Sequence, residues 1–488
     1  MKPAERGVSR GRSSRARGGE GPNGRESEAA LNLGRARLQK SSGQLELPYE
    51  DAGEARGADG SGEGLRATRG NARSGTGCLM GEVVERANLK AALKRVRQNK
   101  GGPGIDGMTV GELPEYLKRE WERIRGELLT GAYQPQAVKR QTIPKAGGGE
   151  RELGIPTVLD RFIQQALLQV LQPRFDPGFS GHSYGFRPGR RAHDAVRRAQ
   201  RYVQEGRRWV VDVDLSKFFD RVNHDILMGR LEKLIEDKRV LGLIRRYLEA
   251  GVMAAGVVVE RHEGTPQGGP LSPLLANVLL DEVDKELERR GHAFVRYADD
   301  SNVYVRSRRA GERVLAGLRK LYAGLKLLVN EDKSAVDYAT RRDFLGYSFW
   351  VAAGKTVKLR VAGKALRTMK ERVRGITRRN GGRSLSRVAE ELKGYLPGWR
   401  AYFEQADTPG VFSDLDKWIR HKLRCLQLKQ WKRGKTVYRE LRARGMPERA
   451  AATVAANTRR WWANSAIAIH IALPNRYFDG LGVPRLAT

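Results

Sequence analysis

The chain has 488 residues, enough for about three domains, and 91 Lys and Arg against 56 Asp and Glu give it a formal net charge of +35. No apolar run approaches the roughly 18 residues of a membrane span, so we expect no membrane partner. Because there are only two cysteines and no apolar secretion signal, we expect neither a disulfide framework nor a four-cysteine zinc site, and a reducing cytoplasm.

The excess positive charge is spread along the chain rather than confined to one tail. Lys and Arg crowd residues 138–151, 187–201, 355–383 and 417–444. Because neutralising phosphates and releasing their counterions drives the binding of basic proteins to polyanions, this distribution predicts nucleic acid as the partner. An acidic membrane surface is the alternative, but the chain lacks an amphipathic anchor with enough apolar area.

The N-terminal part divides into a tail and the start of a folded region. Residues 1–77 are rich in Gly, Arg, Ser and Glu and poor in large apolar residues, which predicts a disordered basic tail. Regular structure is expected from about Met80, where apolar residues recur at helical spacing, and a further helix is expected over Pro114–Leu128.

Residues 136–156 have the pattern of two strands around a glycine-rich turn, with Lys145 and Arg151 on either side of it. Such side chains can bind a triphosphate, Lys as a point charge and Arg through its planar guanidinium group. The alternative is a solvated basic hairpin without a ligand. The segment Ser183–Arg191 then opens a helix with basic side chains at its start.

Two segments carry paired carboxylates among residues typical of buried strands. In Trp209–Asp220 apolar residues alternate, so Asp212 and Asp214 share the opposite face, and periodicity does not say which of them would bind a metal. Further along, two β-prone runs flank Asp299 and Asp300, the pattern of a hairpin with both carboxylates at its tip. Neighbouring carboxylates repel unless a cation such as Mg²⁺ neutralises them, and a polar turn without a metal is the alternative.

The next segments combine a glycine-rich turn with basic helices. Gly264–Pro273 approaches a helix, its glycines would let a ligand come close, and Gln267 is placed to touch a base or sugar. An ordinary helix entry is the alternative. Residues 365–445 predict basic helices interleaved with aromatic residues, which suits structured RNA, although the aromatics also suit the core of a small domain. The pattern assigns no function to residues 446–488, which include the pair Trp461–Trp462.

Several motifs follow one another in a fixed order: Ser183–Arg191, Val213-Asp214 with Phe218-Phe219-Asp220, Gln267-Gly-Gly-Pro-Leu-Ser-Pro273, Tyr297-Ala-Asp-Asp300, Lys333 and Phe344-Leu-Gly-Tyr347. Over residues 80–488 this order resembles a reverse transcriptase, and most closely the bacterial group II intron reverse transcriptase/maturases. The resemblance implies an α/β right-hand polymerase with a mixed palm sheet. Its parts would be an N-terminal extension (78–125), fingers and palm (126–349), a helical thumb/maturase domain (365–445) and a C-terminal segment (446–488).

The resemblance also implies roles for individual residues. In the family the first catalytic aspartate lies five residues before the aromatic that screens the sugar, so Asp214 matches, together with Phe219, and Asp212 becomes a flanking residue. The ligands of two Mg²⁺ ions, or of Mn²⁺ in their place, would be Asp214, the backbone carbonyl of Leu215, Asp299 and Asp300. The nucleotide would be bound by Lys145, Arg151, Phe219, Gln267 and Lys333, the last as a proton donor. RNA would be bound by Arg187, Arg190, Arg191, Lys417, Arg420 and Lys422.

The function implied by the resemblance is an RNA-directed DNA polymerase that uses dNTPs and a DNA primer or target. It would also bind the RNA of its group II intron to assist splicing and mobility, in the bacterial cytoplasm or nucleoid. Because the chain has no C-terminal Cys/His module, it resembles the members that lack a DNA endonuclease. Two alternatives stay open: a maturase with an inactive polymerase core, and a retron-like or diversity-generating reverse transcriptase. The pattern does not specify the oligomeric state.

Overall fold

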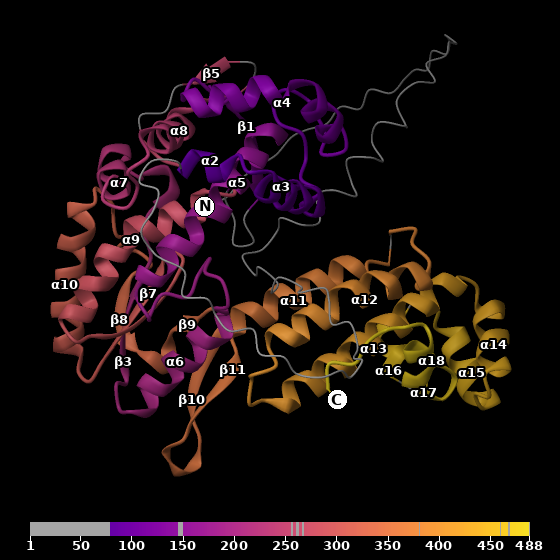
Figure 1. Cartoon of the computed structure of the whole chain (residues 1–488). Coiled ribbons are helices and arrows are strands. Elements are labelled where there is room, and N and C mark those ends of the chain that lie inside the picture. Colours follow the sequence, from indigo (N-terminus) through magenta and orange to yellow (C-terminus); the bar gives the residue numbers. More distant parts are fainter. Residues whose placement is uncertain are drawn as a thin grey trace, which may run out of the picture.

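The computed structural model describes residues 79–144, 150–254, 257–259, 263–265, 268–379, 381–458, 460–466 and 469–487. The tail predicted over residues 1–77 lies outside the described residues. Figure 1 shows a curved arrangement, with the first helices at the top, a sheet and its covering helices along the left side, and an arm of helices at the lower right. Within the described residues, no helix has the length and apolar composition that crossing a bilayer requires.

The first region combines helices with a four-stranded sheet of order β2-β1-β4-β5. Pro114 stands in the first turn of α4, where its missing N–H is not needed, and Gly131 ends that helix at φ +76°. The predicted basic hairpin is present as the antiparallel pair β1–β2, and β1 pairs in parallel with β4. The elements are α2 (Leu79–Val83), α3 (Arg86–Asn99), α4 (Leu113–Thr130), β1 (Val138–Pro144), β2 (Glu150–Ile155), α5 (Val158–Phe175), α7 (His224–Leu231), α8 (Lys238–Glu249), β4 (Val252–Ala254) and β5 (Val257–Val259).

The second region is built on a sheet of order β6-β7-β3-β8. Its strands are β3 (Trp209–Val213), β6 (Ala293–Tyr297), β7 (Asp300–Val305) and β8 (Ala335–Tyr338). Every pair of described strands in it is antiparallel, which differs from the mixed palm sheet that we expected. The reason lies in the connections. The crossover through α10 makes β7 and β8 run in the same direction, but β3 lies between them, so no two parallel strands are neighbours.

Successive residues of β3 pack on opposite faces of this sheet, as its alternation predicts. Val211 and Val213 belong to the core that includes α9 and α10, whereas Val210 belongs to the core that includes α6. The sheet is therefore covered on both faces. The covering helices are α6 (Ala192–Gln204), α9 (Ser272–Arg289) and α10 (Arg308–Gly324).

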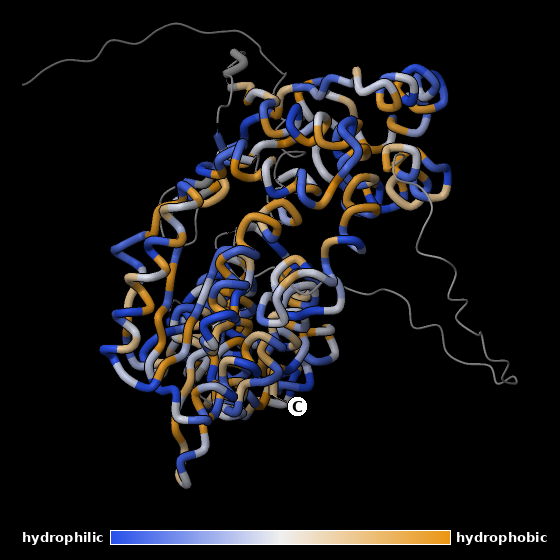
Figure 2. The backbone as a smooth tube through the Cα atoms, turned by 60° about the vertical axis from the view of Figure 1, so that its left-hand side comes forward, coloured by the Kyte–Doolittle hydropathy of each residue, from blue (hydrophilic) through white to orange (hydrophobic). Residues whose placement is uncertain are grey.

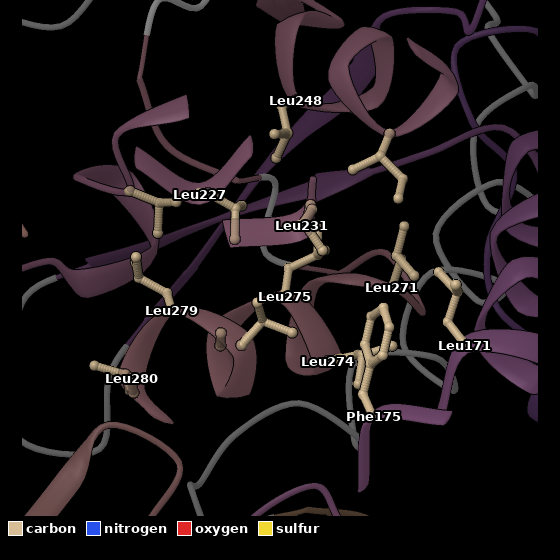
Figure 3. Close-up of a cluster of buried hydrophobic side chains, with 14 of the residues drawn as sticks. Leu171, Phe175, Leu227, Leu231, Leu248, Leu271, Leu274, Leu275, Leu279 and Leu280 are labelled. Carbon is tan, nitrogen blue, oxygen red and sulfur yellow. The ribbon is translucent and has the colours of Figure 1, made fainter. Parts of the chain in front are cut away.

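Helix α9 connects the first two regions through leucines. Figure 3 shows Leu274 and Leu275 of this helix among side chains from α5, α7 and α8. Both leucines are at most 2% exposed, and complete burial of such a side chain contributes about 1.5–3 kcal/mol. This shared core fixes α9, and with it the segment that leads from the glycine-rich motif to the palm sheet. The other labelled side chains are Leu171, Phe175, Leu227, Leu231, Leu248, Leu271, Leu279 and Leu280.

The third region is helical apart from a small sheet, and Figure 2 shows hydrophobic and hydrophilic residues alternating along its helices. Residues of the C-terminal segment, such as Phe478 and Leu486, share a core with α11, α12 and α13. The boundary expected at residue 445 therefore does not coincide with a break in packing. The elements are β9 (Asp343–Phe344), β10 (Tyr347–Val351), β11 (Val357–Val361), α11 (Gly363–Ile376), α12 (Leu385–Tyr402), α13 (Pro409–Trp431), α14 (Gly434–Ala443), α15 (Glu448–Ala456), α16 (Trp461–Ala466), α17 (Ile469–Ala472) and α18 (Asn475–Gly480).

Candidate active site

The turn between β6 and β7 presents two adjacent carboxylates. The strands pair so that Tyr297 lies opposite Asp300, which leaves only Ala298 and Asp299 in the turn. Ala298 has a φ of +57°, as the first residue of the tight hairpin turns that suit the twist of paired strands. The hairpin that the sequence predicts is therefore present, with Asp299 and Asp300 at its tip.

Gly185 makes room for this turn. A Cβ at Gly185 would lie 2.2 Å from the backbone nitrogen of Ala298, so only glycine allows the two backbones to approach so closely. Asn277 of α9 donates to the Gly185 carbonyl at 3.0 Å and accepts from Arg296 at 2.9 Å. The motif Ser183–Arg191 thus supports the turn that carries the carboxylates.

Arg296 holds the same turn from inside the sheet. Its side chain and that of Asp284 are each 1% exposed, and the two form an ion pair of 2.6 Å. The guanidinium also donates to the Ala298 carbonyl at 2.8 Å. A buried ion pair needs such additional hydrogen bonds to offset its desolvation. Sequence reasoning missed both residues, although a charged residue inside the apolar run Phe294–Tyr297 was a signal.

Asp214 lies beside the turn, at the end of the neighbouring strand. It follows Val213, whose partner in β7 is Ser301, so the register places Asp214 next to Asp300. Its backbone N–H donates to the hydroxyl of Ser334 at 3.0 Å. The three carboxylates expected at a metal site therefore come from the same end of two paired strands.

The structure distinguishes the roles of Asp212 and Asp214, which the periodicity of the strand alone does not. Arg342 holds the Asp212 carboxylate through two N–H groups, at 2.6 and 2.8 Å, and Asn302, with its amide turned to donate, adds a contact of 2.9 Å. Asp214 instead faces the ammonium group of Lys333 at 3.3 Å. Asp212 thus belongs to an ion pair within the fold, and Asp214 is the more accessible of the two.

The electrostatics of the turn favour a bound cation. Burial in the surrounding protein and the negative charges of Asp299, Asp212 and Asp214 raise the pKa of Asp300 to about 7. Asp300 keeps exposed surface, so the repulsion from these carboxylates contributes strongly to the raised pKa. The described residues contain no ready-made group of three acidic, His or Cys ligands. Carboxylate oxygens are the ligands that a hard divalent cation prefers, so these three residues fit such an ion. The carboxylate of Asp214 already attracts one positive charge, the ammonium group of Lys333.

A short 3₁₀ helix, Phe218–Asp220, begins four residues after Asp214 and carries Phe219. Lys217 turns the chain at φ +49°. Phe218 then enters the core, while Phe219 stays half-buried with its ring 5.0 Å from that of Phe218. The Phe219 carbonyl accepts a hydrogen bond of 2.7 Å from the N–H of Thr265. The glycine-rich motif therefore begins directly against the turn that carries Phe219.

Several predicted nucleotide contacts lie wholly or partly outside the described residues. Lys145 and Gln267 are outside them, and of Arg151 only the backbone is described, in strand β2. Leu215 directly follows Asp214, and its side chain is 5% exposed. The backbone carbonyl of Leu215, the expected metal ligand, therefore belongs to the residue next to Asp214.

The basic residues expected to contact RNA fall into two groups. The side chain of Arg187 is 2% exposed and pairs with Asp176 at 2.8 Å, and that of Arg420 is 2% exposed and pairs with Asp479 at 2.9 Å. For these two the prediction of RNA contact is corrected, because buried guanidinium groups with internal partners hold the fold together instead. The side chains that keep exposed surface are Arg190, Arg191, Lys417 and Lys422.

Comparisons with known proteins identify two domain families in the chain. The model of the reverse transcriptase (RNA-dependent DNA polymerase) family matches residues 143–349, and that of the group II intron maturase-specific domain matches residues 366–445. Over 291 residues the chain is 34% identical to protein YkfC of Escherichia coli (strain K12), and this alignment covers 51% of the chain and 76% of YkfC. Over 195 residues it is 36% identical to the group II intron-encoded protein LtrA of Lactococcus lactis subsp. cremoris, and this alignment covers 40% of the chain and 32% of LtrA. Among solved structures, a chain of the partial Cas6-RT-Cas1–Cas2 complex aligns with a TM-score of 0.34 and 27% identity, covering 50% of this chain and 42% of that one.

The palm sheet, its carboxylate turn and the match over residues 143–349 define a reverse transcriptase with an α/β polymerase fold. More particularly, the chain belongs to the family of group II intron reverse transcriptase/maturases, because a maturase-specific domain follows the polymerase domain. The family resemblance of the ordered motifs is thereby confirmed. The chain spans about a third of the length of LtrA.

Proposed function

We propose that this chain copies RNA into DNA from dNTPs and a DNA primer, in the bacterial cytoplasm, and that its RNA partner is a group II intron. The observation that carries the proposal is the position of Asp214 next to Asp299 and Asp300, at the same end of two paired strands. Phe219, five residues after Asp214 in the chain, is proposed as the side chain that inspects the sugar of the incoming nucleotide. The experiment that tests the polymerase, primer extension with an aspartate variant, opens the Discussion.

In the proposed mechanism Asp214, Asp299 and Asp300, with the backbone carbonyl of Leu215, hold two divalent ions, Mg²⁺ first and Mn²⁺ as the substitute. When bound, such ions make the primer 3′-hydroxyl more nucleophilic and stabilise the leaving pyrophosphate. Arg296 contributes by fixing the turn through the Ala298 carbonyl, so that two of the carboxylates keep their position without reorganisation.

Other side chains are proposed to handle the nucleotide. Lys145 and Arg151 neutralise the triphosphate, and Gln267 contacts the base or sugar. Lys333 is proposed to give a proton to the leaving pyrophosphate. Its ammonium group lies 3.3 Å from Asp214, and its side chain is 65% exposed, which gives it the reach to turn toward a bound triphosphate.

Replacing Phe219 by Ala should weaken the exclusion of ribonucleotides. The ring is half-buried, and in the proposed role it faces the sugar, so its removal would leave space for a 2′-hydroxyl. We expect the ratio of kcat/KM for dGTP over GTP to fall by roughly 10- to 100-fold, since shape discrimination in a pocket is worth about 1–3 kcal/mol. Single-nucleotide extension measures this ratio. The variant Phe219→Tyr keeps the ring and should keep the ratio, and an unchanged ratio in Phe219→Ala would contradict the role.

The second part of the proposed function is binding of the intron RNA to assist splicing, and we expect this binding to weaken steeply with salt. If Arg190, Arg191, Lys417 and Lys422 each neutralise one phosphate, the plot of log affinity against log salt should have a slope of about −3 to −4. Filter binding of the intron RNA between low and physiological salt measures the slope. A flat dependence would show that phosphate contacts do not dominate.

A further inference from the structure

The sequence leaves the pair Trp461–Trp462 without a function, and its first member, Trp461, borders an open hollow in the third region. Helix α16, which begins with this pair, packs against α13, and Figure 1 shows the two helices side by side. The hollow has a volume of about 440 Å³, within the roughly 300–1,000 Å³ of pockets that hold small ligands. We call it the Trp461 pocket. Its lining residues are Arg374, Thr377, Arg378, Arg379, Lys422, Lys429 and Trp461.

The charge of the Trp461 pocket is uncompensated. Five of its lining side chains are cationic and none is acidic, and within the described residues none of the five forms an ion pair with a carboxylate. Elsewhere in the same region arginines are paired, as Arg383 is with Glu391 at 2.7 Å. Burial lowers the pKa of Lys422, and the charges of Arg379 and Arg374 lower it further. Like charges held so close raise the energy of the empty pocket, and an anion would relieve it.

Tryptophan rings keep these cations in place without neutralising them. The ring of Trp461 has Arg379 at 4.8 Å and Lys429 at 4.5 Å from its centre, and Lys422 lies 5.1 Å from the centre of the Trp462 ring. Such cation–π contacts attract a cation but leave its full positive charge. A carboxylate in the same position would have cancelled it. The cations are therefore held beside the rings and remain available to an anionic ligand.

The kind of anion follows from the neighbouring surface. Trp462 is 50% exposed, and its ring packs against His421 with centres 3.8 Å apart and planes tilted by 52°. An exposed aromatic ring beside a cationic hollow is an arrangement by which proteins hold unpaired nucleotides, because a base stacks on the ring while cations hold the backbone. A base inside a duplex has no free face to offer to Trp462.

We propose that the Trp461 pocket binds a backbone phosphate of a single-stranded nucleic acid segment, with an adjacent base stacked on Trp462. The inference rests on the proposed function and deepens it, since it adds an anchor for unpaired nucleotides around Lys422, one of the predicted RNA contacts of the maturase domain. Unpaired segments of the intron RNA and of a DNA target share the required chemistry. The anchor is separate from the carboxylate site, so it can be tested by binding alone.

The test is fluorescence anisotropy of the full chain with labelled 12-nucleotide oligo(U) RNA and oligo(dT) DNA, over a range of salt. The variant Trp462→Ala should bind about 5- to 100-fold more weakly, the range found for loss of one stacked base. The variant Lys429→Gln should bind more weakly and reduce the salt slope by about 0.7, the share of one phosphate contact. The matched control is Lys435→Gln, an exposed lysine of α14 outside the pocket, which should leave the slope as in the parent. Thermal melting confirms that each variant is folded.

The two oligonucleotides distinguish the source of the ligand, because a loss confined to RNA or to DNA assigns the anchor to that strand. If the parent binds and both pocket variants behave like Lys435→Gln, the pocket is overturned and the proposed function stands. If the parent binds neither oligonucleotide nor the intron RNA, both fail together. If Trp462→Ala weakens the binding of duplex RNA as much as that of single strands, the role of stacking is overturned.

Discussion

Replacing Asp299 by Ala will abolish DNA synthesis and leave the affinity for RNA nearly unchanged. Asp299 lies in the two-residue turn between β6 and β7, and it is one of three carboxylates at that end of the sheet. Metal ions that stabilise a transferring phosphoryl group contribute several kcal/mol, and each 1.36 kcal/mol is a factor of ten in rate. We therefore expect extension to fall by roughly a thousandfold or more.

Primer extension on an RNA template with dNTPs and Mg²⁺ measures this loss, and filter binding of the same RNA measures affinity. The matched control is Asp225→Ala, which removes a carboxylate of α7 whose side chain is 78% exposed and paired with Arg245 at the surface, where an ion pair is worth little. It should extend primers like the parent. Loss of folding or of RNA affinity in Asp299→Ala would contradict the proposed role. A parent that binds the intron RNA tightly but extends no primer would favour a maturase with a silent polymerase core.

Replacing Arg296 by Met will destabilise the palm and also disable the polymerase. The Asp284 carboxylate, 1% exposed, would lose its ion-pair partner, and breaking a buried pair costs about 3–5 kcal/mol. The Ala298 carbonyl would lose its hydrogen bond at the same time, so the carboxylate turn would no longer be fixed. The midpoint of urea unfolding and the rate of primer extension measure the two effects.

A double variant separates stability from positioning. In Arg296→Met with Asp284→Leu, no unpaired charge remains in the core, and apolar replacement of a buried ion pair is often neutral. We expect the unfolding midpoint to return toward that of the parent while extension stays low, because nothing replaces the bond to Ala298. Recovery of extension together with stability would show that Arg296 acts only through folding.

Much of the site could be predicted from the sequence because its elements are local. The hairpin with Asp299 follows from two β-prone runs and the polar residues between them, although the turn is shorter than that polar run, because Ser301 and Asn302 already belong to β7. The alternation of Val211 and Val213 likewise predicts their common face. Such patterns depend on neighbours within a few residues, which a sequence displays directly.

What could not be predicted depends on partners far away in the chain. Strand periodicity puts Asp212 and Asp214 on one face, and only the position of Arg342, 130 residues from Asp212, separates their roles. Arg420 has the basic, helical setting of an RNA contact, but Asp479, 59 residues later, holds it inside the fold. Sequence patterns show that a charge is present and do not show what neutralises it.

The position of β3 between β7 and β8 has a consequence for how the protein is made. Its pairing closes contacts that span more than a hundred residues, such as the bond from Asp214 to Ser334, 120 positions apart. During synthesis, β3 with Val210, Val211 and Val213 leaves the ribosome well before either strand that flanks it. Until then its unpaired backbone and its apolar side chains are exposed to other chains, and pairing between strands so far apart in the sequence is slow. We therefore expect the yield of soluble protein to depend on translation rate and chaperone supply more than on the stability of the finished fold.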